Sequence, residues 1–343
     1  MLIYLLKRLG LFFPTLLIIL TINFLIVQTA PTGPLQTKLE AIKTEQTDFL
    51  QNHQKITTKN DLPIEFLNQL NHQFGFDKPL HERYFLMLRD YARFDLGDSF
   101  FKGQSVSQLI AQKLPISLLF GGLSLMVMYG LGVFFGVLKA YFDGLFFDKV
   151  TAIILAFFYA IPTFVLALAL IVVFAGFRFW HIFPMQAVLP DDFRSLSFFL
   201  QIKTIIYYFT LPVIASSLSG MASIAYLTKF SLMTEKHSAY SRLATAQGLG
   251  KWQIFYHHLI KNASLPILAE MPMTVAGVLF SGNFLVEVIF GIDGIGRLAY
   301  EAAMMKDYPV MFGILYVFTL FGMAVQLIFD ILYHQIDPKV DYR

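Results

Sequence analysis

The chain has 343 residues, of which 56% are hydrophobic and only 14% are charged, and its formal net charge is +3. Soluble domains carry about 25% charged residues, so this composition favours a protein whose solvent is the lipid bilayer. The small net charge indicates no nucleic-acid partner, and the absence of cysteine excludes disulfides, thiolate catalysis and cysteine-based zinc sites.

Six segments are apolar and long enough to cross a membrane, which takes roughly 20 residues. The first four carry no charged residue, Glu270 interrupts the fifth, and Asp330 lies near the end of the sixth. The sequence therefore predicts an all-α membrane protein. Its six transmembrane helices are expected at residues 9–29, 115–138, 150–174, 206–228, 264–286 and 309–332.

The first apolar segment follows Lys7 and Arg8, as the apolar part of a signal peptide also would. That part is about 7–15 residues long and ends in small residues. The run here is longer, and Gln28 stands where a small residue is wanted before Ala30. These features favour a retained first helix over a cleaved leader.

Residues 31–114 form the one large segment between the first and second predicted helices. Its first part is polar, and we expect it to be either helical or poorly ordered. Apolar residues recur at helical spacing in the second part: Leu80, Tyr84, Met87, Leu88 and Tyr91. This spacing predicts an amphipathic helix near the membrane surface or packed on the spans.

The distribution of charge sets the expected orientation. Residues 31–114 carry ten basic and ten acidic residues, whereas the loop from Lys229 to Lys261 carries five basic residues and one acid. Basic loops stay in the cytoplasm, so we expect this loop and both termini to be cytoplasmic. The predicted parts are residues 1–30 with the first helix, the external segment 31–114, and a five-helix core 115–343 containing a cytoplasmic loop 229–263.

Residues 240–266 are a polar island between two apolar segments. About 25 residues far exceed the usual connection of roughly 4–6, so we interpret the island as a docking element. Gly248 and Gly250 predict a break between two short helices, because glycine readily leaves helical backbone geometry. The small residues Ala244 and Ala246 would let another surface approach the backbone.

Prolines and small residues also mark the spans. Prolines occur in or at the start of the third, fourth and fifth spans: Pro162, Pro212, Pro266 and Pro272. Proline can kink a helix but is frequent in membrane helices, so ordinary packing is favoured over a moving hinge. Gly132 and Gly136, four residues apart, suit close helix packing.

The sequence shows no catalytic or phosphate-binding motif. Gly250-Lys251 is followed by Trp252 rather than by serine or threonine, which excludes a phosphate loop there. His257 and His258 are adjacent and project about 100° apart on a helix, so they cannot share a metal. We therefore expect no metal site and no bound cofactor.

Two carboxylates fall within the fifth span or at its end. An acid there is costly and by default faces the bundle interior or a water-filled path, so Glu270, Glu287 and the nearby Asn283 are candidate residues of a translocation path. Alternatively, Glu287 could reach water or cap the next turn, and Glu270 could snorkel or pair helices. Neither is accompanied by the buried ionisable residues of a proton relay.

The polar island resembles the cytoplasmic loop of ABC-importer permeases of the dipeptide and oligopeptide family. There, a run R-x-A-x-A-x-G precedes a basic helix and N-A-x-x-P. The matching positions are Arg242, Ala244, Ala246, Gly248, Asn262, Ala263 and Pro266. Arg242 replaces the acid of the general motif, and Ile260-Lys261 replaces the Leu-Pro of many sugar permeases; both are usual in the peptide branch.

The resemblance extends along the whole chain. Family signatures follow in family order: Lys7-Arg8 before Pro14-Thr15, FGFDKPLHERYF, FDLGDSF, YAIPTF, VEVIFGIDGIG, DYPVMFG and DPKVDY. The sequences FGFDKPLHERYF, FDLGDSF and KDYPVMFG are similar to the corresponding segments of the B-type permeases of Yej peptide importers.

This resemblance implies a non-catalytic permease subunit that forms half of the translocation path of an ATP-driven peptide importer. The implied partners are a second homologous permease, two ATP-binding subunits or domains that carry ATP and Mg, and a periplasmic solute-binding protein. The implied location is the bacterial inner membrane, with both termini cytoplasmic. The residues implied in ATPase coupling are Arg242, Ala244, Ala246, Gly248, Leu249, Gly250, Lys251 and Trp252.

A different class of function stays open, namely a secondary transporter or channel that works without ATPase subunits. Such proteins more often show an internal repeat or several buried ionisable residues, and the sequence shows neither. A membrane-embedded enzyme is a third alternative, but the sequence lacks a recognisable catalytic set.

Overall fold

The computed structural model describes residues 2–29, 78–176, 179–280 and 284–336. Within these ranges the regular structure is helical, apart from an isolated bridge between Asp98 and Ser105. The chain divides into two compact units. Of the described residues, those within 113–297 and from Phe321 to Ile336 belong to the larger unit, and those within 2–112 and 298–320 belong to the smaller. The prediction of an all-α protein is confirmed.

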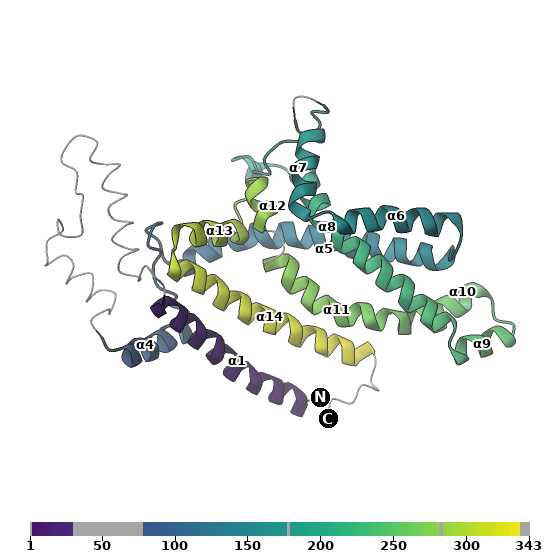
Figure 1. The fold of residues 1–343 in the computed structure, drawn as a ribbon, viewed down its shortest axis with the longest axis horizontal. Helices are drawn as coiled ribbons and strands as arrows, with labels where there is room; N and C mark the ends of the chain where they lie inside the picture. The colour runs from purple at the N-terminus through teal and green to yellow at the C-terminus, as the bar shows by residue number, and fades with distance from the viewer. Residues whose placement is uncertain (1, 30–77, 177–178, 281–283, 337–343) are drawn as a thin grey trace. The chain divides into compact units, whose positions relative to one another are not determined.

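Five stretches of helix are long and apolar enough to cross a membrane. They belong to α1 (Leu2–Thr29), α5 (Val106–Tyr141), α8 (Phe198–Lys236), α11 (Ile260–Phe280) together with α12 (Phe284–Ile289), and α14 (Tyr308–Ile336) (Figure 1). The third predicted span is instead a pair of helices, α6 (Phe146–Ala160) and α7 (Thr163–Phe174), bent by 102°. If this pair counts as one span, the described part of the chain has the six that the sequence predicts.

Pro162 accounts for the break between α6 and α7. It lies at the N-cap of α7, and Ile161 before it is extended, with φ −81° and ψ 126°. A residue that precedes proline is sterically disfavoured in the helical region, so α6 ends where Pro162 requires it to end. The expectation of one helix over residues 150–174 is corrected accordingly.

The larger unit is organised around α8, which has 39 residues and contacts α6, α7 and α11. Two glycines of α5 lie directly against it. A Cβ added at Gly132 would come within 2.8 Å of Ile224, and one at Gly136 within 2.5 Å of Thr228. Only glycine allows this approach, so the predicted close packing at these two positions is confirmed.

The smaller unit contains the predicted amphipathic helix, α4 (Leu80–Ala92). The Tyr84 hydroxyl forms a 2.6 Å hydrogen bond with Thr21 of α1, and the buried Tyr91 ring meets Tyr316 edge-on at 5.2 Å. Tyr84 and Tyr91 of the predicted face therefore pack against apolar helices, whereas Leu80 at the start of the helix is 57% exposed. The remaining elements are η2 (Phe193–Ser195), α13 (Ile295–Met305) and the short helices of the polar island.

Candidate functional site

The polar island folds as two helical pieces joined at Gly248. The first piece is α9 (Ala239–Ala246), and the second begins with α10 (Lys251–Ile254). Gly248 has φ +82°, and its amide donates to Thr245 while that of Leu249 donates to Ala244. This is the Schellman arrangement, in which glycine adopts the left-handed conformation that ends a helix. The predicted glycine break is confirmed.

The second piece is not a separate helix. From α10 the chain continues through a π-helical turn, η3 (Phe255–Leu259), straight into α11. α10 and the apolar α11 therefore form one uninterrupted helical stretch. We call residues 239–259 the coupling segment, after the role that the sequence resemblance implies for them.

The inner face of the coupling segment is anchored to the larger unit. A buried apolar cluster joins it to the ends of α5 and α8 and to the start of α11: Ala140, Leu232, Ala244, Ile254, Leu259 and Ala263. Ala244 is only 4% exposed. Its small side chain therefore packs inside the chain, and the approach of another surface to the backbone at this position stays a prediction.

Tyr240 adds a polar anchor to this packing. Its hydroxyl donates to the Glu235 carboxylate of α8 and accepts from the Asn262 side-chain amide of α11 at 3.1 Å. Burial, and next the Glu235 carboxylate, raise the pKa of Tyr240 above its usual value, so the phenol stays protonated and continues to donate. No spacing in the sequence indicates this link between α8, α9 and α11.

The outer face of the coupling segment exposes large apolar side chains. Trp252 is 69% exposed and Tyr256 62%, and Leu243 and Leu249 are also exposed. We call these four residues the docking surface. The Trp252 and Tyr256 rings lie next to each other, with their centres 6.3 Å apart. Exposed apolar side chains that cluster on a polar loop are typical of an interaction site. Leu249 and Trp252 are among the residues that the sequence singled out, whereas Leu243 and Tyr256 were missed because short helices show too few turns for a periodic pattern.

Three other expected coupling residues, Arg242, Ala246 and Gly250, are exposed, and so is Gly248. The structure brings all four into the same short segment as the docking surface. The side chain of Lys251 lies outside the described part of the chain.

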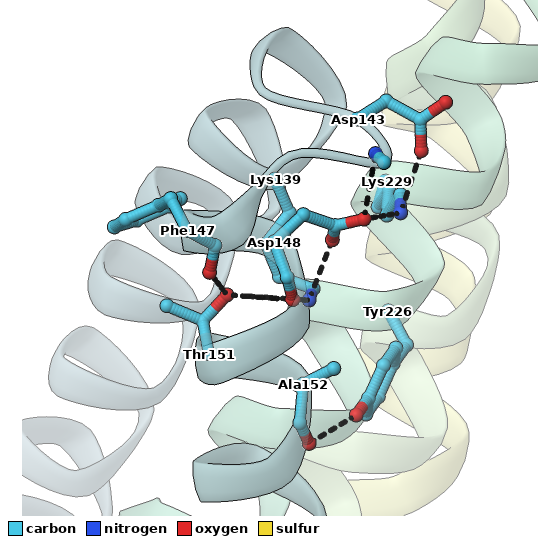
Figure 2. Close-up of polar contacts among 9 residues, drawn as sticks. Lys139, Asp143, Phe147, Asp148, Thr151, Ala152, Tyr226 and Lys229 are labelled. Carbon is cyan, nitrogen blue, oxygen red and sulfur yellow. Dashed lines mark hydrogen bonds and ion pairs between the residues drawn. The ribbon is translucent and has the colours of Figure 1, made fainter.

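Four charged residues lie close together around the α5–α6 turn (Figure 2). We call Lys139, Asp143, Asp148 and Lys229 the charged layer. The Lys139 ammonium is 2.8 Å from one Asp148 carboxylate oxygen, and the Lys229 ammonium is 2.7 Å from the other. Lys229 also pairs with Asp143 at 2.8 Å. The layer therefore links α5, the α5–α6 turn, α6 and α8.

Lys139 is only 1% exposed, and its ammonium has further partners besides Asp148 Oδ1. Its ammonium also donates to the Asp148 carbonyl oxygen at 2.9 Å and to the Thr151 hydroxyl at 3.3 Å, and it lies 5.4 Å from the centre of the Tyr226 ring (Figure 2). Lys139 directly precedes Ala140, a member of the buried apolar cluster described above. The charged layer thus continues the anchor of the coupling segment deeper into the larger unit.

Glu287 is 3% exposed and is used inside the fold. Its carboxylate accepts from the Ser117 hydroxyl at 3.1 Å and from the Arg297 amide at 2.8 Å, and Ser117 accepts from the Ile295 amide at 2.7 Å. These amides begin α13 and have no partner within that helix, so the two side chains cap it. This geometry favours the capping alternative for Glu287.

The other two candidate path residues are placed differently. Glu270 is exposed on α11 and lines a groove that does not include Glu287. Asn283 lies outside the described residues. The structure therefore does not place Glu270 and Glu287 in one groove, and the role of all three residues in a path stays a prediction.

Comparisons with known proteins agree with these features. Residues 132–342 match the family described as binding-protein-dependent transport system inner membrane component. The chain is 38% identical to the inner membrane ABC transporter permease protein YejB of Escherichia coli O157:H7, over 99% of both chains. It is also 38% identical to the peptidoglycan transport system permease protein YejB of Agrobacterium fabrum, over 99% of this chain and 98% of that protein.

A third relative is the oligopeptide transport system permease protein OppB of Escherichia coli K12, 30% identical over the full length of both chains. The higher identity to the two YejB proteins than to OppB confirms the predicted branch. This chain belongs to the family of binding-protein-dependent transport system inner membrane components, which are the permease subunits of ABC transporters.

Proposed function

We propose that this chain forms half of the translocation path of an ATP-driven peptide importer in the inner membrane. The names of two of its relatives refer to peptidoglycan and oligopeptide transport. A short peptide is the chemical part that these cargoes share, so peptide is the substrate class we assign. The subunit is non-catalytic, and ATP hydrolysis occurs on partner ATP-binding subunits.

The observation that carries the proposal is the docking surface on a segment that is continuous with α11 and anchored to α5 and α8. An ATP-binding subunit bound to the docking surface (Leu243, Leu249, Trp252 and Tyr256) would transmit its movement to the apolar helices. The movement would pass through packed side chains rather than through a flexible loop. Arg242, Ala246, Gly248, Gly250 and Lys251 belong to the same proposed contact. Ala244 supports it from inside.

The remaining partners follow from the family. A second permease would complete the path, two ATP-binding subunits would dock from the cytoplasm, and a solute-binding protein would deliver peptide from the periplasm. We propose that residues 31–114 face that protein and that both termini are cytoplasmic, because charge is distributed so unevenly between the loops.

Gly248 and Gly250 provide a matched test of the coupling role. Gly248→Val forces a β-branched residue into the left-handed region, which costs about 1–3 kcal/mol locally and misdirects Leu249 and Trp252. Gly250→Ala is the comparison variant within the same proposed contact. The φ of Gly250 is not positive and its Cβ would meet only Gln253, at 3.7 Å, so this change adds a methyl group without straining the backbone and should have the smaller effect. In proteoliposomes of the whole importer, we expect Gly248→Val to reduce peptide-stimulated ATPase activity and uptake by about tenfold or more, as a barrier change of about 1.4 kcal/mol implies.

Both variants should enter the membrane in normal amounts, since neither glycine lies in an apolar span. Co-purification of the ATP-binding subunits is the second measurement, and we expect Gly248→Val to weaken it. Full uptake and intact co-purification in Gly248→Val would show that the coupling segment does not dock the ATPase.

A further inference from the structure

A groove of about 320 Å³ opens on the larger unit between α5, α6, α8 and α11. Its polar lining comes mainly from two helices, with Ser219 and Ser223 on α8 and Glu270 and Thr274 on α11. Each pair is spaced by four residues, so its two side chains share one helix face. Apolar side chains such as Met128 and Val278 complete the wall.

The groove lies deep within the apolar part of the larger unit. Met128 is eleven residues from Lys139 on α5, and Ser219 is ten from Lys229 on α8. Glu270 is nine residues from Lys261 on α11. At 1.5 Å per residue these separations are about 14–17 Å on every helix. Since the hydrocarbon core is about 30 Å thick, the groove lies near its middle.

Glu270 needs a polar environment at this depth. Its side chain is exposed, and it makes no hydrogen bond or ion pair with the residues that the structure describes. A carboxylate facing hydrocarbon at the centre of a bilayer is costly, so acids there face water or a partner of opposite charge. The face that carries Glu270 is therefore not a lipid face.

We propose that the groove is a peptide subsite in which Glu270 binds the α-ammonium group of the peptide. This inference rests on the proposed import of peptides. The carboxylate complements an ammonium and would repel a C-terminal carboxylate, so the peptide enters with its N-terminus in the groove. The hydroxyls of Ser219, Ser223 and Thr274 can both donate to and accept from a peptide backbone.

The size of the groove fits this assignment. Small-molecule sites enclose roughly 300–1,000 Å³, so this one admits the first part of a peptide rather than a whole oligopeptide. Its apolar walls accept side chains without selecting among them. The site thus reads the one group that all unmodified peptides carry at their N-terminus.

The absence of cysteine from the chain makes water access directly measurable. In the assembled importer, single-cysteine variants Thr274→Cys and Ser223→Cys are treated with a charged, water-soluble methanethiosulfonate, and labelling of this subunit is followed. Ile153→Cys, on an exposed apolar part of α6, is the control for a lipid-facing site. We expect labelling at 274 and 223 and none at 153.

Protection by peptide tests the ammonium assignment. Trialanine should slow the labelling of Thr274→Cys, and N-acetyl-trialanine should need an about tenfold higher concentration, as expected when a charge-assisted contact of about 1.4 kcal/mol is lost. Adding Glu270→Gln should remove this difference, whereas adding Glu82→Gln, an exposed acid of α4, should leave it unchanged.

Three outcomes would overturn the proposal. They are no labelling at either 274 or 223, equal protection by the two peptides, and a difference that survives Glu270→Gln. Release of the second permease by Glu270→Gln, without labelling, would assign this face to the permease interface instead. Trialanine uptake by the importer without any substitution separates this proposal from the proposed function. If that importer takes up no trialanine, peptide import itself is contradicted, whereas normal uptake together with one of the outcomes above contradicts only the subsite.

Discussion

At the scale of single residues, the charged layer shows how an apolar unit tolerates charge. Two ammonium groups and two carboxylates make its net charge zero, and one carboxylate, Asp148, serves both lysines. Lys139 is buried, so it depends on that carboxylate, whereas Lys229 has Asp143 as a second partner. Because a buried charge without its counter-charge is strongly destabilising, the two aspartates are not equivalent.

This inequality gives a prediction for Asp148→Asn and Asp143→Asn. The first leaves the Lys139 ammonium buried without a counter-charge, which costs about 3–5 kcal/mol. The second removes an aspartate whose side chain is 40% exposed, which costs at most about 1 kcal/mol. Thermal unfolding of the purified importer should show a clear decrease in melting temperature for Asp148→Asn only. Equal decreases would mean that Lys139 does not depend on Asp148.

Residue type alone does not distinguish buried structural residues from exposed residues of a candidate site. Ala244 and Ala246 are the same residue type two positions apart on α9, yet one is buried and the other exposed. Glu287 and Glu270 both read as acids in the fifth span, but one caps α13 and the other lines a groove. Such differences depend on which neighbour folds over the residue, and a linear pattern does not contain that information.

At the scale of helices, contacts between α5 and α8 depend on glycine. The added Cβ at Gly136 would also lie 2.7 Å from the Ala225 carbonyl oxygen, which belongs to the backbone and cannot rotate away. Gly130, six residues earlier on α5, has nothing within 4 Å of its added Cβ. The two glycines therefore differ in function although both lie in the same apolar helix.

We predict that Gly136→Leu separates α5 from α8, while Gly130→Leu is tolerated. Overpacking of a close contact costs about 1–3 kcal/mol or more, and a leucine at an open apolar position costs little. The melting temperature of the assembled importer and its peptide uptake should both decrease for Gly136→Leu. A normal melting temperature for that variant, with α5 in place, would contradict the close packing.

Helix positions were largely predictable, because five long apolar runs and one amphipathic repeat carry strong signals. The break at Pro162 was visible as a proline, but not as a bend of 102° between α6 and α7. The fusion of the second island helix with α11 was also missed. Its basic and aromatic residues read as a separate surface element, and only backbone hydrogen bonding shows that the helix continues.

At the scale of the whole molecule, sidedness is the property on which the proposed function depends. The coupling segment must face the ATP-binding subunits in the cytoplasm, and the segment before α5 must face the periplasm. The basic excess of the loop from Lys229 to Lys261 supports this arrangement. A coupling segment on the periplasmic side could not meet an ATPase.

Two glutamines at exposed positions test the arrangement, Gln104 before α5 and Gln247 at the end of α9. In a chain without other cysteines, we expect Gln104→Cys to react with a membrane-impermeant maleimide in intact spheroplasts. Gln247→Cys should react only after permeabilisation. Labelling of both cysteines from the same side would contradict the predicted topology.

The sequence by itself determined the solvent, the helical class, the expected sidedness and the family, because these depend on the sum of many apolar, charged and motif residues. Only the tertiary structure decided that Lys139 shares Asp148 with Lys229, that Glu287 caps α13, and that Glu270 meets two serines of α8 around a groove. Each of these joins residues that are distant in sequence, through side-chain contacts that exist only after the helices have packed. Helical and apolar patterns depend on neighbours in the sequence, whereas a site depends on contacts between residues of different helices.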